Sequence, residues 1–506
     1  MTPGRGNWSR PRRFDRNLVV IGAGSAGLVS AYLGAALRAG VTLVEADRMG
    51  GDCLNTGCVP SKALIRSARL AVESRRAAAL GLLGPPLAVD FAAVMDRVQA
   101  MIGAVAPHDS VERYAALGVD VRRGTARIVS PWCVEVDGSP ITTRGIIIAT
   151  GAEPIVPDLP GLVGTEYFTS ETLWRLRILP RRLLVLGGGP IGCEMAQAFA
   201  ELGSQVSVLQ QAPRLLMRED DEVSAFVAER MAADGVRVLT RHKPIAIEVD
   251  EAGRVMRIEH DGVVRAEPFD ALLVAIGRHP RTAGYGLEEL GIGITLTRTV
   301  ETDAWLQTIH PNILACGDVA GPYQFTHAAA HQAQSAVLTG LFAPFYRSRP
   351  DYSVMPAVTF TDPEVARVGL NEREARAQGI AYECTRYDLH ELDRAIVDGA
   401  TEGFVKVLTR PGKDRILGAA IVGVHAGETL AEFALAMRHG IGLKGLLNTV
   451  HAYPTYAEAN RYVAGAWRRA HASPTALGLL ARFHAWRRGR AAPSQSEHPN
   501  QEVPST

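Results

Sequence analysis

The chain carries little net charge and few cysteines for its length of 506 residues. Its 54 Lys and Arg residues nearly balance 53 Asp and Glu residues, so the formal charge is +1 at pH 7. A charge this close to zero gives no reason to expect a nucleic-acid partner. The length and the 47% hydrophobic content are sufficient for several domains with buried cores.

The N-terminal region has no segment that we interpret as a signal peptide or a membrane span. Residues 1–16 contain five arginines and are predicted to form a basic tail. The long uncharged stretch that follows would stand out in a hydropathy scan. This stretch contains a glycine-rich turn and a helix, both of which are parts of a nucleotide-binding domain. We therefore expect the stretch to be buried inside such a domain.

Only six cysteines occur, and four of them are scattered and predicted to be buried or incidental thiols: Cys133, Cys193, Cys316 and Cys384. The other two, Cys53 and Cys58, lie in the segment GDCLNTGCVPSK of residues 51–62. Two thiols this close can cycle between a disulfide and a dithiol. They could instead be small buried side chains or half of a metal site, but no third or fourth ligand lies nearby. A cycling pair suits the reducing cytoplasm.

The spacing of the two cysteines requires a distorted helix start. Five residues on a regular helix would place the side chains well apart around the cylinder. Gly57 relaxes the backbone, and Pro60 fits only the first turn of a helix, so the cysteines should lie where that helix begins. Free backbone N–H groups at a helix start also favour a thiolate.

A dinucleotide-binding pattern precedes the cysteines. A short apolar run, 17–21, leads into GAGSAG at 22–27, then a helical stretch to about residue 40 and a strand over 41–44 that ends at Glu45. Glycines permit the tight turn and the approach of a pyrophosphate, and the acidic residue lies where a ribose hydroxyl would be bound.

The same pattern occurs a second time. The apolar run 182–186 leads into GGGPIG at 187–192, and the strand 205–209 ends at Gln210. The distance from the first glycine to the terminal residue is the same in both copies, since 45 − 22 and 210 − 187 both equal 23. Each copy also closes alike, with Ala149-Thr150-Gly151 and Ala275-Ile276-Gly277 after apolar runs. Two dinucleotide-binding domains are predicted.

These motifs together resemble the flavoprotein disulfide reductases of the pyridine nucleotide family, which include dihydrolipoamide dehydrogenase, glutathione reductase and mercuric reductase. The resemblance covers roughly residues 17–470. It implies an α/β protein with two Rossmann-like domains, for FAD and NAD(P), and an α+β C-terminal dimerisation domain. The implied ranges are 17–155 and 279–350 for FAD, 156–278 for NAD(P) and 351–470 for dimerisation.

The resemblance also implies roles for individual residues. Cys58 would lie nearer the flavin, Cys53 would face the substrate, and Lys62 would pair with Glu194 near the flavin. The residues implied for FAD are Gly22, Gly24, Gly27, Glu45, Lys62, Ala126, Thr150, Gly151, Asp318 and His327. Those implied for NAD(P)H are Gly187, Gly189, Gly192, Gln210 and Gly277.

One position departs from most of the family. In dihydrolipoamide dehydrogenase and glutathione reductase a histidine precedes a proline, and a glutamate five residues later orients it. This chain has the glutamate, as Glu458, but Tyr453 stands in place of the histidine. An imidazole titrates near 6.5, whereas a phenol titrates near 10 and mostly donates a proton. Mercuric reductase similarly has a tyrosine, but it also has a C-terminal cysteine pair, and this chain has no cysteine after Cys384. His451 is an alternative base.

Two further features leave alternatives open. Gln210 neither binds a ribose diol strongly nor repels a 2′-phosphate, and Arg214 could contact that phosphate, so use of both nucleotides or a preference for NADPH is expected. His327 and His331 are four apart, the spacing of some zinc sites, but no third ligand is evident, so we predict packing near the flavin and no metal site.

Residues 471–506 lie beyond the family core. Leucines and aromatic residues alternate with arginines between 477 and 490, which predicts a short basic helix packed on its own dimer or, as the alternative, resting weakly on a membrane surface. The tail after it is predicted to be disordered.

These observations lead to one functional hypothesis and two alternatives. The first is a homodimeric FAD enzyme that takes hydride from NAD(P)H and passes electrons through Cys53 and Cys58 to a disulfide or a thiophilic metal, as mercuric reductase does. The second is a dihydrolipoamide dehydrogenase-type enzyme that uses NAD⁺. The third is a redox sensor or scaffold without turnover.

Overall fold

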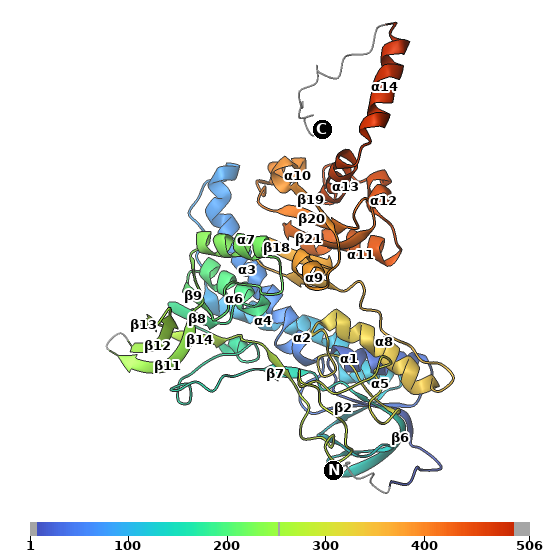
Figure 1. Cartoon of the computed structure of the whole chain (residues 1–506). Coiled ribbons are helices and arrows are strands. Elements are labelled where there is room, and N and C mark those ends of the chain that lie inside the picture. The colour runs from blue at the N-terminus through green and yellow to red at the C-terminus, as the bar shows by residue number, and fades with distance from the viewer. Residues whose placement is uncertain (1–7, 251–252, 490–506) are drawn as a thin grey trace. The chain divides into compact units, whose positions relative to one another are not determined.

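The computed structural model describes residues 8–250 and 253–489, which form two compact units. The larger unit contains residues up to 217 together with 224–351 (Figure 1). The smaller unit contains residues 218–223 and the chain from residue 352 onward.

A seven-stranded sheet forms the first half of the larger unit. Its main path is β3-β2-β1-β6-β5-β4, and β16 pairs with β6. β1 pairs in parallel with β2 and β6, while β5 pairs antiparallel with β4 and β6. The strands are β1 (Arg16–Ile21), β2 (Val41–Glu45), β3 (Asp120–Arg123), β4 (Ala126–Ser130), β5 (Cys133–Val136), β6 (Ser139–Ile148) and β16 (Ile313–Ala315).

The central strand β1 is buried on both faces, which explains its continuous apolar run. Leu18 and Val20 belong to a core shared with α1 (Ser25–Ala36) and α8 (Thr326–Phe342). Val19 and Ile21 belong to a second core on the opposite face. Side chains alternate between the faces of a strand, so a strand covered on both sides needs apolar residues at every position.

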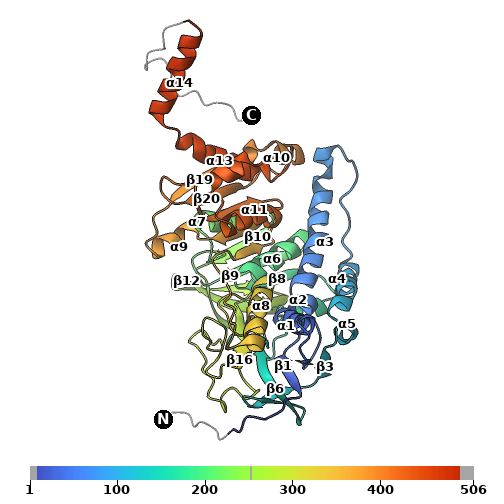
Figure 2. The same cartoon turned by 90° about the vertical axis from the view of Figure 1, so that its right-hand side faces the viewer.

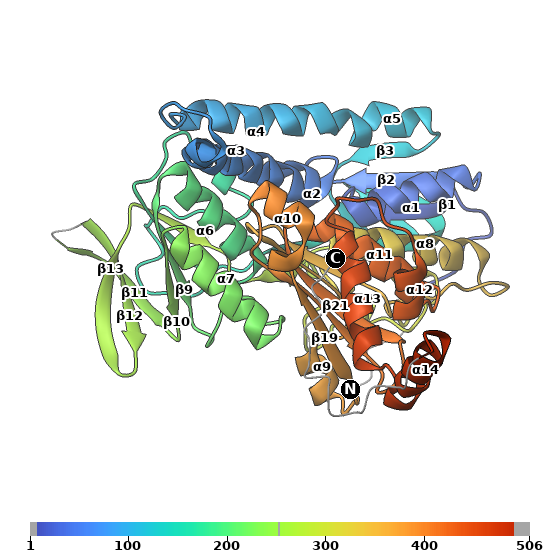
Figure 3. The ribbon, with the colours of Figure 1, turned by 90° about the horizontal axis from the view of Figure 1, so that it is seen from above.

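A group of helices follows the first glycine turn. It consists of α2 (Gly51–Asn55), α3 (Cys58–Arg76), α4 (Phe91–Val105) and α5 (Val111–Ala116). α3 packs against α4 and against α6 (Pro190–Leu202) of the second half. Figure 3 shows α3 and α4 side by side. The cysteine segment is therefore held between the two halves of the larger unit.

The second half is built on a parallel four-stranded sheet in the order β10-β9-β8-β14, with α6 packed on β8 and β9. α7 (Asp221–Ala233) follows β9. A three-stranded antiparallel sheet, β11-β12-β13, and a two-stranded ribbon, β7-β15, complete it. The strands are β7 (Ala152–Pro154), β8 (Arg182–Leu186), β9 (Gln205–Gln210), β10 (Val236–Thr240), β11 (Lys243–Asp250), β12 (Gly253–His260), β13 (Val263–Pro268), β14 (Ala271–Val274) and β15 (Arg278–Pro280).

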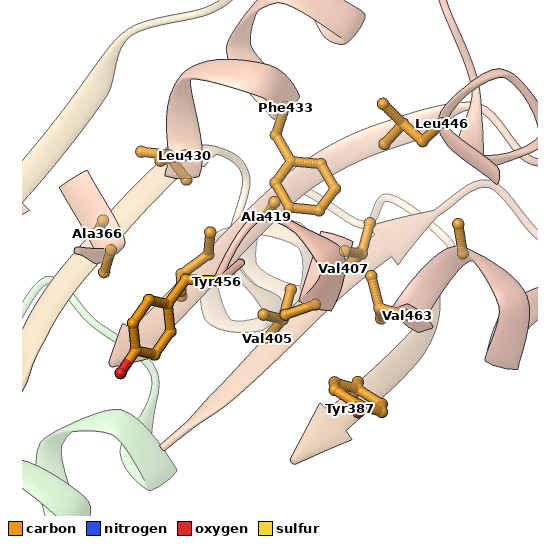
Figure 4. Close-up of a cluster of buried hydrophobic side chains, with 14 of the residues drawn as sticks. Ala366, Tyr387, Val405, Val407, Ala419, Leu430, Phe433, Leu446, Tyr456 and Val463 are labelled. Carbon is orange, nitrogen blue, oxygen red and sulfur yellow. The ribbon is translucent and has the colours of Figure 1, made fainter. Parts of the chain in front are cut away.

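The smaller unit contains an antiparallel five-stranded sheet covered by helices. The sheet order is β17-β18-β21-β20-β19. Its core includes Val405, Val407 and Ala419 of the sheet together with Leu430 and Phe433 of α11 (Figure 4). The elements are β17 (Pro356–Thr359), β18 (Glu364–Gly369), α9 (Glu372–Ala377), β19 (Glu383–Asp388), α10 (Asp393–Asp398), β20 (Phe404–Thr409), β21 (Ile416–Gly423), α11 (Ala426–Arg438), α12 (Leu443–Asn448), α13 (Glu458–Ala470) and α14 (Pro474–Arg487).

The predicted basic helix is α14, and it extends away from the sheet of its own unit (Figures 1 and 2). Leu479, Phe483 and Trp486 are 65%, 47% and 74% exposed. Within the residues that the structure describes, no helix combines the length and the apolar character needed to cross a bilayer. Most of the predicted N-terminal tail, residues 1–7, and the predicted disordered tail from 490 onward lie outside the described residues.

The fold is α/β with two Rossmann-like halves and an α+β C-terminal unit, as predicted. The strand predicted at 182–186 has the bounds of β8, and the strand predicted at 205–209 corresponds to β9, which also includes Gln210. The cysteine segment differs in detail. Only Cys58 begins the long helix α3, because Cys53 lies in the separate one-turn helix α2 and Gly57 separates the two helices.

Candidate functional site

The first glycine turn forms a cradle that only glycine can line. Gly22 has a φ of +100°, and a Cβ built there would lie 2.4 Å from the carbonyl oxygen of Ala149. A Cβ on Gly27 would lie 1.7 Å from the carbonyl oxygen of Gly22. The Glu45 carboxylate accepts hydrogen bonds from the backbone N–H of Ala23 at 2.6 Å and of Asp47 at 2.9 Å. The turn thus leaves the backbone N–H groups at the start of the helix accessible to a phosphate group, next to a carboxylate that is held in place.

The second glycine turn repeats this geometry. Gly187 has a φ of +113°, and its Cβ would lie 2.4 Å from the carbonyl oxygen of Ala275. A Cβ on Gly192 would lie 1.9 Å from the carbonyl oxygen of Gly187. Gln210 takes the place of Glu45, since its Oε1 accepts from the N–H of Gly188 at 3.1 Å. The repeat seen in the sequence is therefore a repeat of backbone contacts.

A cavity extends from the first cradle to the two cysteines. It is lined by most of the residues expected to hold FAD and by the expected redox group: Gly22, Gly24, Glu45, Cys53, Cys58, Lys62, Ala126, Thr150, Gly151, Glu194 and Asp318. Gly27 lies behind the turn and does not line the cavity. His327 does not line it either; its exposed ring stacks on Phe325 at 5.2 Å, and Thr326 lines the cavity in its place.

The two thiols differ in acidity because they are hydrogen-bonded to each other. The bond to Cys58, together with burial, raises the pKa of Cys53. The bond from Cys53, a bond to Thr326 and the charge of Lys62 lower the pKa of Cys58 to about 6. The Cys58 Sγ lies 3.5 Å from the Thr326 Oγ1. These two directions favour a Cys58 thiolate beside a Cys53 thiol in the dithiol form.

A short turn lets the cysteines approach each other from two helices. A Cβ on Gly57 would lie 3.0 Å from the carbonyl oxygen of Asp52 and 3.3 Å from the Cα of Cys53. Pro60 lies in the first turn of α3. All six cysteines are free thiols in this structure.

An ion pair joins the two halves next to the thiols. The Nζ of Lys62, on α3, lies 2.8 Å from the Oε2 of Glu194, on α6. The Glu194 side chain is 7% exposed and that of Lys62 is 36% exposed. A buried carboxylate needs such a partner. The pairing that the resemblance implied is present.

Asp318, which the resemblance implied, lines the cavity beside three residues that were not foreseen from the sequence: Ser170, Trp174 and Arg278. Burial raises the pKa of Asp318 to about 6, and Arg278 approaches that carboxylate at 4.0 Å. Arg278 also forms an ion pair with Asp52, directly before Cys53. Ser170 and Trp174 line the same cavity. No local pattern marks these residues, because each acts through a contact distant in sequence.

The second cavity follows the second glycine turn. Gly187, Gly189, Gln210 and Gly277 line it, whereas Gly192 lies behind the turn. Arg214, proposed as a contact for a 2′-phosphate, does not line it; its Nη2 donates to the carbonyl oxygen of Met217 at 3.4 Å.

Tyr453 has a different partner from the one expected. Its hydroxyl donates to the carboxylate of Asp393 at 3.0 Å, and this bond raises the pKa of Tyr453. Glu458 instead accepts from the Thr455 N–H at 3.1 Å and from the Tyr462 hydroxyl at 3.3 Å.

The alternative base, His451, is engaged at both ring nitrogens. Its Nε2 lies 2.8 Å from the Glu432 carboxylate and its Nδ1 lies 3.1 Å from the Thr449 carbonyl oxygen. Its side chain is 6% exposed. These contacts hold the ring in place, and His451 stays an alternative to Tyr453 as the acid–base group.

The histidine pair does not assemble a metal site. The Nε2 of His331 accepts from the backbone N–H of Asp351 at 3.1 Å. In the described part of the chain, no cluster of three or more His, Cys, Asp and Glu side chains is placed to hold a metal ion.

The arrangement of cradle, carboxylate and thiols fits FAD. The glycine turn accepts a pyrophosphate only because Cβ atoms are absent, Glu45 is held at the ribose position, and the cavity reaches the sulfur pair. The second cradle fits a nicotinamide dinucleotide by the same backbone geometry.

Comparisons with known proteins agree with this geometry. Residues 16–333 match the pyridine nucleotide-disulphide oxidoreductase family, and residues 355–464 match the dimerisation domain of that family. A dihydrolipoyl dehydrogenase of Chlamydia pneumoniae is 35% identical over 452 residues, which are 88% of this chain and 95% of that protein. A mercuric reductase of Bacillus cereus is 31% identical over 445 residues, which are 88% of this chain and 70% of that protein.

A solved structure shows the same fold. The Cu(II) complex of RclA, an HOCl-induced flavoprotein disulfide reductase from Escherichia coli, superposes with a TM-score of 0.79 at 28% identity, over 89% of this chain and 99% of that one. The family uses FAD and NAD(P)H. The paired glycine cradles, the cysteine pair and these matches show that the chain belongs to the pyridine nucleotide-disulphide oxidoreductase family.

Proposed function

We propose that this oxidoreductase uses Cys53 and Cys58 to deliver two electrons from NAD(P)H to an electrophilic sulfur or a thiophilic metal ion. One observation carries the proposal. Both thiols line the same cavity as the first glycine cradle and the Lys62–Glu194 pair. Bound FAD would supply the redox chemistry that links a reduced nicotinamide to the sulfur pair.

The two thiols have separate roles in this proposal. With a disulfide substrate, the Cys53 sulfur attacks and releases one thiol; the Cys58 sulfur then attacks Cys53, releases the second thiol and closes the Cys53–Cys58 disulfide. The Cys53 thiol and the Cys58 thiolate together hold one proton, which leaves on one product thiol, and Tyr453 or water supplies the proton of the other. The Cys58 thiolate is the base nearest to the Cys53 thiol, which holds its proton at neutral pH. With a metal ion, both sulfurs would act as ligands.

Tyr453 favours the reductive direction. Its hydrogen bond to Asp393 raises the pKa of the phenol, so Tyr453 keeps its proton at neutral pH and suits donation to a leaving thiolate. Dithiol oxidation would require a base at this position. We therefore place this protein nearer to mercuric reductase than to dihydrolipoamide dehydrogenase in its chemistry.

An acceptor screen tests the proposal. We would follow NADH and NADPH oxidation with Hg(II), Cu(II), glutathione disulfide, lipoamide and a quinone, beside the Cys53→Ser/Cys58→Ser variant. We expect turnover with at least one sulfur or metal acceptor, and loss of that turnover in the variant. Equal rates in the two proteins would overturn the proposal.

The alternative is a dihydrolipoamide dehydrogenase-type enzyme, favoured by the 35% identity to the Chlamydia pneumoniae protein. Dihydrolipoamide oxidation by the wild-type chain at rates above those with every electrophilic acceptor would establish it. Steady turnover with any acceptor would exclude the third hypothesis, a sensor without catalysis.

We further propose a homodimer whose C-terminal helix contacts an anionic membrane surface. The matched dimerisation domain supports dimerisation, and α14 lies beyond its matched range. Residues 459–489 contain six arginines and no acidic residue. The exposed side chains of Leu479, Phe483 and Trp486 and the arginines of the same helix support the contact, although α14 does not separate the two kinds of residue onto opposite faces.

Vesicle sedimentation separates this contact from packing within the dimer. We expect binding to phosphatidylserine vesicles, little binding to phosphatidylcholine vesicles, and loss of binding in Phe483→Ser/Trp486→Ser while the variant stays dimeric. A wild-type chain that ignores anionic vesicles would overturn the membrane contact, and a monomeric variant would show that α14 packs in the dimer. Because the cycling thiols need a reducing compartment, we propose the cytoplasm as the location.

A further inference from the structure

The indole of Trp174, which lies outside the loop between the two redox cysteines, is hydrogen-bonded to that loop. The Nε1 of Trp174 donates to the carbonyl oxygen of Thr56 at 2.8 Å and to the carbonyl oxygen of Ser170 at 2.8 Å. Thr56 lies between Cys53 and Cys58, at the end of α2. Trp174 is 7% exposed and Thr56 is 9% exposed, so water does not compete freely for these bonds.

The start of the same loop is held by a guanidinium. Arg278 forms an ion pair with Asp52, the residue directly before Cys53. Its Nη2 also donates to the carbonyl oxygen of Ala152 at 2.6 Å, and its Nη1 donates to the Oγ of Ser170 at 3.4 Å. Ser170 therefore joins the two contacts: its carbonyl accepts from Trp174 and its hydroxyl accepts from Arg278.

The anchoring residues come from the two connections between the halves of the larger unit. Ser170 and Trp174 lie on the path from β7 to β8, and Arg278 begins β15, which three residues separate from the end of β14. Ser170 and Arg278 also line both cavities. The redox loop is thus tied to the segments that face the second nucleotide cavity.

We propose that Trp174 is a positioning residue that, with Ser170 and Arg278, clamps the 52–57 loop and keeps the Cys53 and Cys58 sulfurs within bonding reach. This inference rests on the proposed function of the cysteine pair. The two cysteines belong to different helices joined only through Thr56 and Gly57, so the loop has freedom to separate them in the dithiol form. A disulfide restricts that freedom covalently, whereas the dithiol depends on the clamp.

The direction of the effect follows from this difference. Loss of the clamp releases the dithiol form more than the disulfide form, so the effective concentration of one sulfur at the other falls. The disulfide then becomes easier to reduce. A three- to tenfold fall corresponds to a shift of about 15 to 30 mV toward less negative potential for a two-electron couple.

The test compares Trp174→Phe with wild type and with Trp305→Phe, all as full-length FAD-bound proteins. Phenylalanine keeps an aromatic ring but cannot donate to Thr56. Trp305 lines neither cavity, and its ring lies against Arg347. Each protein is equilibrated in dithiothreitol redox buffers and alkylated, and the Cys53 and Cys58 thiols are quantified by mass spectrometry. Amide hydrogen exchange of the peptide containing 52–57 is measured in parallel.

We expect a three- to tenfold lower ratio of disulfide to dithiol in Trp174→Phe at a given buffer potential and faster exchange of the 52–57 amides, with Trp305→Phe unchanged. Identical thiol equilibria and exchange in Trp174→Phe and wild type would overturn the clamp while leaving the cysteine cycle intact. A wild-type protein that forms no Cys53–Cys58 disulfide would overturn the proposed function itself. If Trp174→Phe loses FAD, the same measurements are made on Ser170→Ala and Asp52→Asn, which remove the contacts with Arg278 and keep the indole. Unchanged thiol equilibria in both variants would refute the clamp.

Discussion

The Tyr453 hydroxyl lies 3.0 Å from the Asp393 carboxylate, on α10, and not against Glu458 five residues downstream. Glu458 is 4% exposed and supports the turn and helix around Thr455 and Tyr462. The phenol itself is 69% exposed. Tyr453 thus presents a protonated hydroxyl at the surface of the smaller unit, steadied by a neighbouring carboxylate.

The first prediction concerns this pair. Asp393→Asn removes the charge that raises the pKa of Tyr453, so the alkaline limb of the kcat/KM profile with a disulfide or metal acceptor should move to lower pH. Tyr453→Phe should remove the limb. In contrast, Tyr453→His should raise dihydrolipoamide oxidation about tenfold or more, because an imidazole can accept the thiol proton. An unmoved limb in Asp393→Asn would show that the phenol does not act in turnover.

The second prediction concerns the acidity of Cys58. Since its pKa is lowered to about 6, the reduced protein should alkylate at Cys58 with a rate that rises through pH 6 and levels off above it. Lys62→Met removes a positive charge that favours the thiolate, so the midpoint should move upward. The iodoacetamide rate, followed peptide by peptide, gives both midpoints. A wild-type midpoint between 8 and 9, near the ordinary value of a thiol, would contradict the account.

The third prediction separates the two glycine cradles. Gly27→Ala places a Cβ 1.7 Å from a backbone oxygen in the first turn, and Gly192→Ala places one 1.9 Å away in the second. Gly27→Ala should purify with little or no FAD, whereas Gly192→Ala should keep FAD and bind NAD(P)H at least about tenfold more weakly. Gly478→Ala, which meets nothing within 4 Å, is the control. Flavin absorbance and nucleotide titration measure the two effects. Equal FAD content in all three variants would disprove the assignment of the first cradle.

The fourth prediction concerns the choice of nucleotide. Gln210→Glu should keep the bond to the Gly188 N–H and add a charge that binds a ribose diol and repels a 2′-phosphate. The ratio of kcat/KM for NADH to that for NADPH should rise about tenfold or more. Arg214→Ala should change the wild-type ratio little, since Arg214 does not line the cavity. A collapse of NADPH use in Arg214→Ala would mean that Arg214 turns toward the nucleotide when it binds.

The fifth prediction tests the stability of the smaller unit. Lys406 is 3% exposed and forms ion pairs with Asp220 at 2.8 Å, with Glu372 at 2.9 Å and with Glu222. Burial lowers the pKa of Lys406, but the hydrogen bonds to these carboxylates outweigh it and raise the pKa. Lys406→Met leaves the acids unpaired and should cost about 3 to 5 kcal/mol in the free energy of unfolding. Lys413→Met, at an exposed turn, should change it by less than about 0.5 kcal/mol, as denaturant titration would show.

The parts of the site that sequence could predict are those fixed by local geometry. Gly27 and Gly192 could be assigned because a Cβ on either would meet the carbonyl oxygen of a glycine five residues earlier, and the first glycine of each turn could be assigned because the tight turn needs a positive φ there. The helix start at Cys58 could be predicted from Gly57 and Pro60, whereas the contacts that lower the pKa of Cys58, with Cys53, Thr326 and Lys62, are seen only in the structure.

Other contacts join residues far apart in sequence and carry no periodic signal. The Lys62–Glu194 pair was expected only through the resemblance, because 132 residues separate its members. Trp174 and Thr56 are 118 residues apart, and Asp393 and Tyr453 are 60 apart. The contact between His451 and Glu432 spans 19 residues and has no local sequence signal either.

Anaerobic reduction of the FAD-bound protein by NADH or NADPH, followed by alkylation and thiol mapping, tests the central claim most directly. The account predicts that about one equivalent of nucleotide produces two new thiols, at Cys53 and Cys58, together with a long-wavelength thiolate-to-flavin absorbance that Cys58→Ser lacks. Consumption of the nucleotide and bleaching of the flavin with the Cys53–Cys58 disulfide left intact would contradict it.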